Sequence, residues 1–246
     1  MKIYEARAKA NLIIKNHLVV DTMAGYGEIS DGHNRDSDYN GSGRTLEFSR
    51  STADTTGEVI DAAAGLGYRL YFGESDDFFV DDLILTVLGG YGYNRQKLND
   101  KNLFREIPVF GSTDGLNSTY ETVWKGPWAG FELAGAKEKV SGSFRFEYHF
   151  ADYNAEANWN LRSDFQHPKS FEHFSDGYGL VFNCGLGYQI NDRWNINLSG
   201  DLQRWKTDSG LMRFYFANGT ITDTRLNEVE WYSWAVLLGA TYYFNL

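Results

Sequence analysis

Long segments of this 246-residue chain alternate between apolar and polar side chains. In residues 4–14 the apolar side chains stand at every second position, and the positions between them include Glu5, Arg7 and Lys9. Because successive side chains of a β-strand point to opposite faces, this period of two predicts a strand with one apolar and one polar face. The same pattern recurs in residues 57–72, 140–152, 178–190, 193–205 and 234–246. The chain is therefore predicted to be all-β.

The length of these segments and the charges on their polar faces favour a membrane barrel over a soluble sheet. The segments exceed the ~5–6 residues of a typical soluble strand and match the ~9–11 residues that cross a bilayer. Charged residues such as Arg145 and Glu147 occupy the polar face, and a dry core would make them costly. A hydrated or ion-paired barrel interior tolerates them, so the apolar face is predicted to meet lipid.

The connections between the segments fall into two classes. Short connections are predicted at 15–17, 137–139 and 191–192, and long polar ones at about 30–56, 98–118, 154–175 and 207–228. Short turns at one end and long loops at the other are typical of outer-membrane barrels. An aromatic content of 16% suits girdles at the two membrane interfaces. We therefore expect a bacterial outer-membrane protein whose loops are exposed at the cell surface.

The expected fold is a transmembrane antiparallel up-and-down β-barrel with about nine strands in this chain. The strands are predicted at 3–15, 18–29, 57–72, 83–97, 119–136, 139–153, 176–190, 193–206 and 229–246. Bacterial single-chain barrels have even strand numbers, and an exported protein needs a signal peptide, which is not visible after Met1. We therefore expect residues 1–246 to form a single domain of a ten-stranded parent whose signal peptide and first strand precede Met1.

The final segment, residues 234–246, alternates to the last residue of the chain. It resembles the terminal-strand signal read by the barrel-assembly machinery, in which a glycine precedes hydrophobic residues at every second position. An ordinary edge strand is the alternative, although an open edge would invite pairing with other chains. Outer-membrane lipid, lipopolysaccharide and the barrel-assembly machinery are therefore the expected partners.

The formal net charge of −10 restricts the class of ligand. Nucleic acid is not expected, because neutralising its phosphates requires a basic face. An acidic interior or mouth would attract cationic ligands or basic peptides, whereas acidic loops that only keep the exposed end hydrated are the simpler interpretation. The single cysteine, Cys184, excludes an internal disulfide. Nucleotide, zinc-protease and zinc-cluster motifs are absent, so no metal or cofactor is expected.

Several motifs resemble those of the omptins, which are outer-membrane endoproteases of Gram-negative bacteria with ten strands and tall extracellular loops. Residues 36–39 (Asp-Ser-Asp-Tyr) and 47–51 (Glu-Phe-Ser-Arg-Ser) resemble the first long omptin loop. Residues 126–130 (Gly-Pro-Trp-Ala-Gly) look like the start of the sixth strand, and residues 177–246 track the last three strands. These motifs are collinear with the family from about residue 4 to the end.

The resemblance implies a peptide-cleaving site in which an Asp–Asp pair and a His–Asp pair together position a water molecule. Asp36 and Asp38 match the first pair, and a carboxylate-oriented His suits a general base near neutral pH. The family's Asp-x-His falls near Asn158 and Asn160, neither of which can act as a base, and Ser51 stands where the family has His. The resemblance thus implies an omptin scaffold without standard omptin proteolysis.

Other histidines could supply a base if the mouth is arranged differently. His149 and Asp152 lie at the top of the preceding strand, and His167 and His173 lie in the following loop. The Asp36 segment, Asp-Ser-Asp-Tyr-Asn-Gly, also suits a turn or weak cation binding, although it lacks the ligand spacing of a calcium loop.

Three functions from different classes remain open. The first is a barrel that binds a ligand or partner, such as a cationic peptide or protein, through its extracellular loops. Its candidate binding residues are Tyr39, Ser49, Arg50, Asn158, Asn160 and His173. The second is an active omptin-type endopeptidase, which could require lipopolysaccharide for activity or stability. The third is a small passive pore or a structural barrel.

Overall fold

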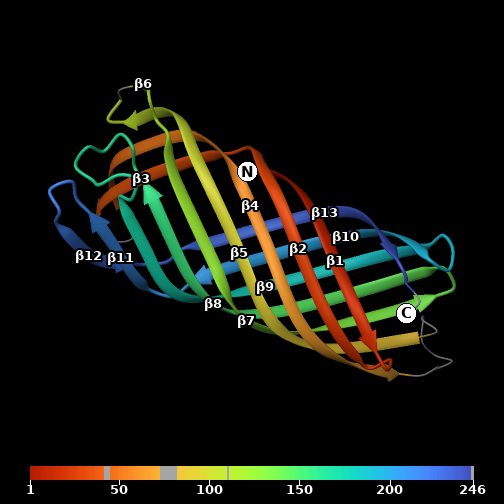
Figure 1. Ribbon diagram of the computed structural model, residues 1–246. Coiled ribbons are helices and arrows are strands. Elements are labelled where there is room, and N and C mark those ends of the chain that lie inside the picture. Colours follow the sequence, from red (N-terminus) through yellow and green to blue (C-terminus); the bar gives the residue numbers. More distant parts are fainter. Residues whose placement is uncertain (42–44, 73–81, 110, 245–246) are drawn as a thin grey trace.

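The computed structural model describes residues 1–41, 45–72, 82–109 and 111–244. One continuous antiparallel sheet curls around a central lumen (Figure 1). Its wall consists of nine strands in the order β1 (Lys2–Ile14), β2 (Leu18–Asp31), β4 (Thr45–Phe72), β5 (Asp82–Ile107), β7 (Ser118–Lys137), β8 (Val140–Asn158), β9 (Phe171–Gln189), β10 (Trp194–Thr207) and β13 (Glu230–Tyr242). The predicted antiparallel all-β fold is confirmed, and each predicted strand has its counterpart in this wall.

Four further strands extend the sheet at the end opposite the short turns, here called the loop end. β3 (His33–Gly41) pairs with the first half of β4, and β6 (Gly111–Thr113) pairs with β5. β11 (Gly210–Tyr215) pairs with β12 (Ile221–Leu226) and with the start of β9. Among the described residues, no helix is long and apolar enough to span a membrane.

The prediction of long polar loops at this end is wrong in part. β4 contains 28 residues and β5 contains 26, so much of the predicted loop sequence continues the wall as strand. The reason is that hydrophobic alternation ends where the wall leaves the apolar band, whereas backbone pairing continues beyond it. A strand with water on both faces needs no apolar side, and its sequence therefore reads as a loop.

The outward face of β8 marks where the apolar band ends. Outward-facing residues change from Phe144, Phe146, Tyr148 and Phe150 to Asp152, Asn154 and Glu156. Phe150 is 58% exposed, as expected for a side chain that meets lipid. The wall therefore crosses the membrane with its lower part, near the short turns, and extends above the membrane at the loop end.

Ion pairs cross the lumen and hold the curled sheet together. Arg145 of β8 contacts Asp21 of β2, with its Nη2 2.7 Å from Oδ2, although three strands separate β8 from β2 in the sheet. Arg7 of β1 pairs with Asp201 of β10 in the same way. These four side chains are largely buried, so each charge depends on its partner for compensation.

Candidate functional site at the barrel mouth and lumen

The β3–β4 hairpin gathers the residues that resemble the first omptin loop. Asp36 stands opposite Ser51 and Asp38 opposite Ser49 in the antiparallel register. The Asp36 side chain is exposed, whereas the Asp38 side chain lies outside the described side chains. Tyr39, on the same hairpin, is also exposed. Backbone pairing therefore brings the predicted Asp pair and Ser49 to one side of the mouth.

Arg50 links the middle of this hairpin to β5. Its Nε lies 2.8 Å from Glu47 Oε1, and its Nη1 lies 3.4 Å from Glu106 Oε2 of β5. The hydrogen bond from Arg50 holds the pKa of the Glu47 carboxyl below its ordinary value. The guanidinium is thus already paired with two carboxylates. To bind a ligand, as predicted from the sequence, Arg50 would have to give up one of these ion pairs.

On the other side of the mouth, the two predicted asparagines hold loops in place. Asn160 Oδ1 accepts a hydrogen bond from the Asn117 backbone N–H at 2.8 Å, and its Nδ2 donates to the Gly115 carbonyl at 2.7 Å. Asn158 Oδ1 lies 2.7 Å from His167 Nδ1. These amides fasten the segment before β7 and the β8–β9 connection, so both are engaged in local structure.

His173 lies in the part of β9 above the apolar band, inside an aromatic group. Its Nδ1 is 3.0 Å from the Tyr120 hydroxyl, which is 2.6 Å from the Tyr153 hydroxyl. Burial lowers the pKa of His173 to about 4, and no carboxylate among the described residues bonds to it. The imidazole is therefore neutral at physiological pH and lacks the acid that would orient a general base.

Sequence reasoning missed Tyr120 and Tyr153, the hydroxyl partners of His173. The spacing does contain a signal for Tyr153. It stands two residues after Ala151 and four after His149, so it shares their inward face. The approach of Tyr120 and His173 requires the pairing of β7, β8 and β9, which the alternation alone does not specify.

His149 lies lower, inside the lumen, and has an acid partner. Its Nε2 is 2.8 Å from Glu147 Oε2, and Glu147 Oε1 accepts a 2.6 Å hydrogen bond from Arg145 Nε. Asp152, the acid predicted beside it, faces outward and lies 3.7 Å from Lys125 Nζ. The structure therefore separates His149 from Asp152. An offset of three residues places two side chains on opposite faces of a strand, whereas the two-residue offset to Glu147 keeps them on one face.

The hairpin and the lumen histidine lie at different levels. His149 pairs with Trp128 of β7, Trp128 pairs with Gly90 of β5, and Gly90 pairs with Gly65 of β4. Asp36 pairs with Ser51, which lies on the same strand β4. The difference of 14 residues (65 − 51) corresponds to about 45 Å along the strand. Asp36 and His149 therefore do not face each other across one mouth. Among the described side chains, no group of three or more His, Cys, Asp or Glu is able to hold a metal ion.

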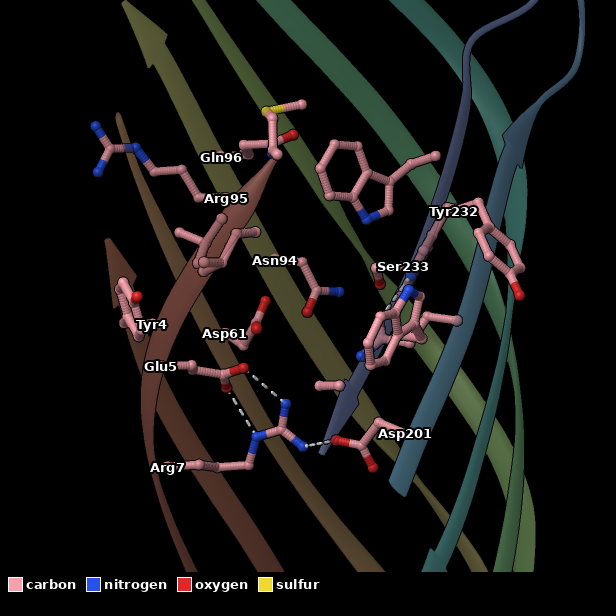
Figure 2. A pocket seen from close by; sticks show the side chains of 18 of the residues that line it. Tyr4, Glu5, Arg7, Asp61, Asn94, Arg95, Gln96, Asp201, Tyr232 and Ser233 are labelled. Carbon is pink, nitrogen blue, oxygen red and sulfur yellow. Dashed lines mark hydrogen bonds and ion pairs between the residues drawn. The ribbon is translucent and has the colours of Figure 1, made fainter. Parts of the chain in front are cut away.

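A cavity of about 750 Å³ lies beside the lumen at the level of the upper part of β1. Figure 2 shows Asp61 and Asn94 pointing into it, with Arg7 held between Glu5 and Asp201 below them. Trp124, Trp205 and Trp231 add aromatic surface to its lining. A smaller cavity of about 70 Å³ adjoins His149, Arg145 and Asp21.

Several polar groups that line the larger cavity have no partner among the described residues. Asp61 makes no hydrogen bond or ion pair there, although it is only partly exposed. Gln96 Nε2 and Thr122 Oγ1 are buried without a hydrogen-bond partner. Buried polar groups normally have partners, so these three side chains remain able to bind water or a polar ligand.

The family model for Pom, the Protochlamydia outer membrane protein, matches residues 1–244. The chain belongs to this family. Among solved structures, this Pom-family barrel is similar to the crystal structure of outer membrane protease OmpT from Escherichia coli, with a TM-score of 0.78. The two sequences are 12% identical, and the match covers 95% of this chain and 81% of OmpT. No curated protein matches the sequence.

These comparisons confirm the omptin-like outer-membrane β-barrel and its location in the bacterial outer membrane. The Pom-family barrel is therefore surrounded by membrane lipid along its apolar band. At 12% identity the likeness to OmpT shows the fold alone, so the chemistry of the mouth rests on the residues of this chain.

Proposed function

We propose that this Pom-family barrel binds a cationic ligand or protein partner at its loop end and lacks omptin-type peptide hydrolysis. The observation that carries the proposal is the position of the histidines. His173 is enclosed with Tyr120 and makes no bond to a described carboxylate. His149 is paired with Glu147 well below the hairpin that carries Asp36. An Asp pair without an opposing acid-held His lacks the base that would activate water.

The charge of the mouth supports a cationic partner. Residues 152–176 contain five acids and two bases, which gives −5 + 2 = −3. This segment runs from the end of the apolar band on β8 through the β8–β9 connection to β9. Acidic surface at the entrance raises the local concentration of cations. We further propose lipopolysaccharide and the barrel-assembly machinery as the partners that the barrel needs for stability and insertion.

The first test is peptide cleavage. Full-length protein in lipopolysaccharide, incubated with fluorogenic dibasic peptides, is expected to show no turnover above the protein-free background. Robust turnover that Asp38→Ala abolishes would contradict the proposal. It would favour the active endopeptidase, for which the His149–Glu147 pair is the best-supported base. In that case His149→Ala should abolish cleavage, whereas His173→Ala should do so if the enclosed imidazole is the base instead.

The second test is binding. A fluorescent hexalysine peptide is expected to bind the full-length protein, and a hexaglutamate peptide of the same length is not. Replacing both Asp152 and Asp176 by Asn should weaken hexalysine binding several-fold, because it removes two of the five acids of this segment. Asp192→Asn, at the opposite end of the barrel, is the matched control and should change nothing. Equal binding by both peptides, or insensitivity to the double substitution, would refute the charge argument.

A passive pore is the remaining alternative, favoured by the polar lumen and its cavity of about 750 Å³. The ion pairs Arg145–Asp21 and Arg7–Asp201 cross that lumen and oppose free passage. Planar-bilayer recordings of the full-length protein are therefore expected to show no discrete conductance steps. Regular steps that change in size with Arg145→Gln would establish a pore through the lumen.

A further inference from the structure

The two ends of the sheet leave backbone groups unpaired inside the membrane. β1 pairs with β2 on one side, and β13 pairs with β10 on one side; among the described residues neither strand pairs on its other side. Both strands carry lipid-facing apolar residues, such as Tyr4 on β1 and Trp234 on β13. Hydrocarbon offers no hydrogen bonds to backbone N–H and C=O groups, so an open edge at this depth requires a partner strand.

The directions of the two edge strands restrict that partner. β1 runs from the loop end to the short turn at residues 15–17. β13 also runs away from the loop end, because its last residues pair with the start of β10 beside the short turn at 190–193. Direct pairing of β1 with β13 would therefore be parallel. A strand that runs toward the loop end pairs antiparallel with both.

The space between these edges is a gap through the wall. The cavity of about 750 Å³ is lined by Glu5 and Ser233, which face the lumen, and also by Tyr4 and Trp234, which face lipid. Lining from both faces means that the cavity connects the lumen to the outside between β1 and β13. Figure 2 shows this interval, with Tyr4 on one side and Tyr232 on the other.

We propose that a tenth β-strand closes this gap and that the polypeptide preceding Met1 supplies it. Such a strand would run from the turn end to the loop end, where β1 begins, so a loop-end connection would join the two. Residues 234–246 resemble a terminal strand, which favours an upstream source over a downstream one. A second copy is disfavoured, because copies in one membrane share an orientation and would offer only edges that run in the same direction.

The gap also defines the composition of the strand. About 9–11 residues are needed to cross the bilayer. Alternate residues should be apolar, to continue the outer surface between Tyr4 and Trp234. The residues between them should be polar or small, because they face Arg7, Asp61 and Asp201 across the cavity. The tenth strand is required whether or not the proposed ligand binds at the loop end.

The first experiment is the intact mass and N-terminal sequence of the mature protein, purified from its own outer membrane. The expected result is at least one extra segment before Met1 that is long enough to span the bilayer and alternates in polarity. A mature N-terminus at Met1 would overturn the proposal. Extra residues found only beyond Leu246 would also overturn it, in favour of a downstream strand.

The second experiment is residue-resolved hydrogen exchange of the mature protein in lipid nanodiscs. We call the open edges of β1 and β13 the seam. In β1, only the amides that point toward β2 have a partner in the described sheet, so without a tenth strand every second amide of β1 would be unprotected. With a tenth strand, all central amides of β1 and β13 are expected to be protected. A proline in the middle of the upstream segment should speed exchange of the seam amides by roughly tenfold or more and leave β8 unchanged.

Unprotected seam amides in the mature protein would overturn the inference. Seam protection that the upstream proline leaves unaffected would also overturn it, in favour of another source. Native mass spectrometry then separates direct β1–β13 closure, which gives a monomer, from pairing with a second copy, which gives a dimer. The wild-type protein alone supplies the mass and the exchange pattern, so the inference stays testable even if the proline variant fails to fold.

Discussion

The two sides of the barrel mouth are built differently. On the side of β8, β9 and β11, aromatic rings pack into a block: Trp159 lies 4.7 Å from Phe171 between ring centroids, and Phe165 lies 5.6 Å from Phe214. Phe165 and Phe171 are both 5% exposed. On the side of the β3–β4 hairpin, Leu46 is 75% exposed, and the visible supports are backbone pairing and ion pairs.

This difference separates two kinds of predicted site residue. On the packed side, Asn158, Asn160 and His173 use their polar atoms to hold the loops and the aromatic block together. On the hairpin side, Asp36 and Tyr39 are exposed on a pair of hydrogen-bonded strands. Substitution of one of these three packed-side residues is therefore expected to affect folding, whereas substitution of Asp36 or Tyr39 is expected to leave the fold intact.

The largest expected effect comes from Tyr153→Ala. Tyr153 is 0% exposed, and its ring lies 4.4 Å from that of Trp124, so truncation leaves a cavity in the packed side of the mouth. The free energy of unfolding should fall by about 3–5 kcal/mol. Tyr39→Ala, the matched change on the hairpin, should lower it by about 0.5 kcal/mol or less. Urea unfolding from lipid vesicles measures both, and similar losses would remove the distinction between the two sides.

An intermediate effect is expected from acid. The pKa of His173 is about 4 in the folded protein, below its ordinary value of 6.5, because burial disfavours the charged form. The unfolded chain therefore binds a proton first as the pH falls. The stability due to neutral His173 is complete above pH 6.5 and is lost progressively between pH 6.5 and pH 4.

At pH 5 this loss amounts to about 2 kcal/mol relative to pH 8. Urea unfolding at the two pH values measures it, and His173→Phe should reduce the difference by that amount. Ser49→Ala is the control on the hairpin side; it removes no titratable group and should leave the difference unchanged. If the His173 variant keeps the full pH dependence, the loss of stability in acid has another source.

The smallest effect is expected from Arg50→Gln on the hairpin. Its ion pairs with Glu47 and Glu106 are accessible to solvent, which screens such pairs and reduces their contribution to stability. The thermal midpoint in lipid vesicles should equal that of the wild type within error. A drop of several degrees would show that the ion pairs of the hairpin stabilise the protein. The two sides of the mouth would then not differ in their contribution to stability.

The sequence by itself determined the nine strands of the wall within the apolar band, their faces and the type of membrane. A period of two fixes which side chains share a face, so the inward set that contains Arg145, Glu147 and His149 follows from spacing alone. The same rule places Asp152 on the other face and Glu147 on the same face as His149, to which it bonds. The omptin-like motifs identified the fold correctly because they follow the order of the strands.

Only the tertiary structure decided which strands meet across the lumen and which loop segments pair. Asp21 and Arg145 stand 124 residues apart in sequence, and their contact depends on how far the sheet curls. β3 carries no apolar face that alternation could reveal, because water lies on both sides of the wall above the membrane. The alternation of polarity depends on neighbours along the chain, whereas the curvature and register of the sheet depend on all of its strands. The contacts between distant residues of the site could therefore be found only in the tertiary structure.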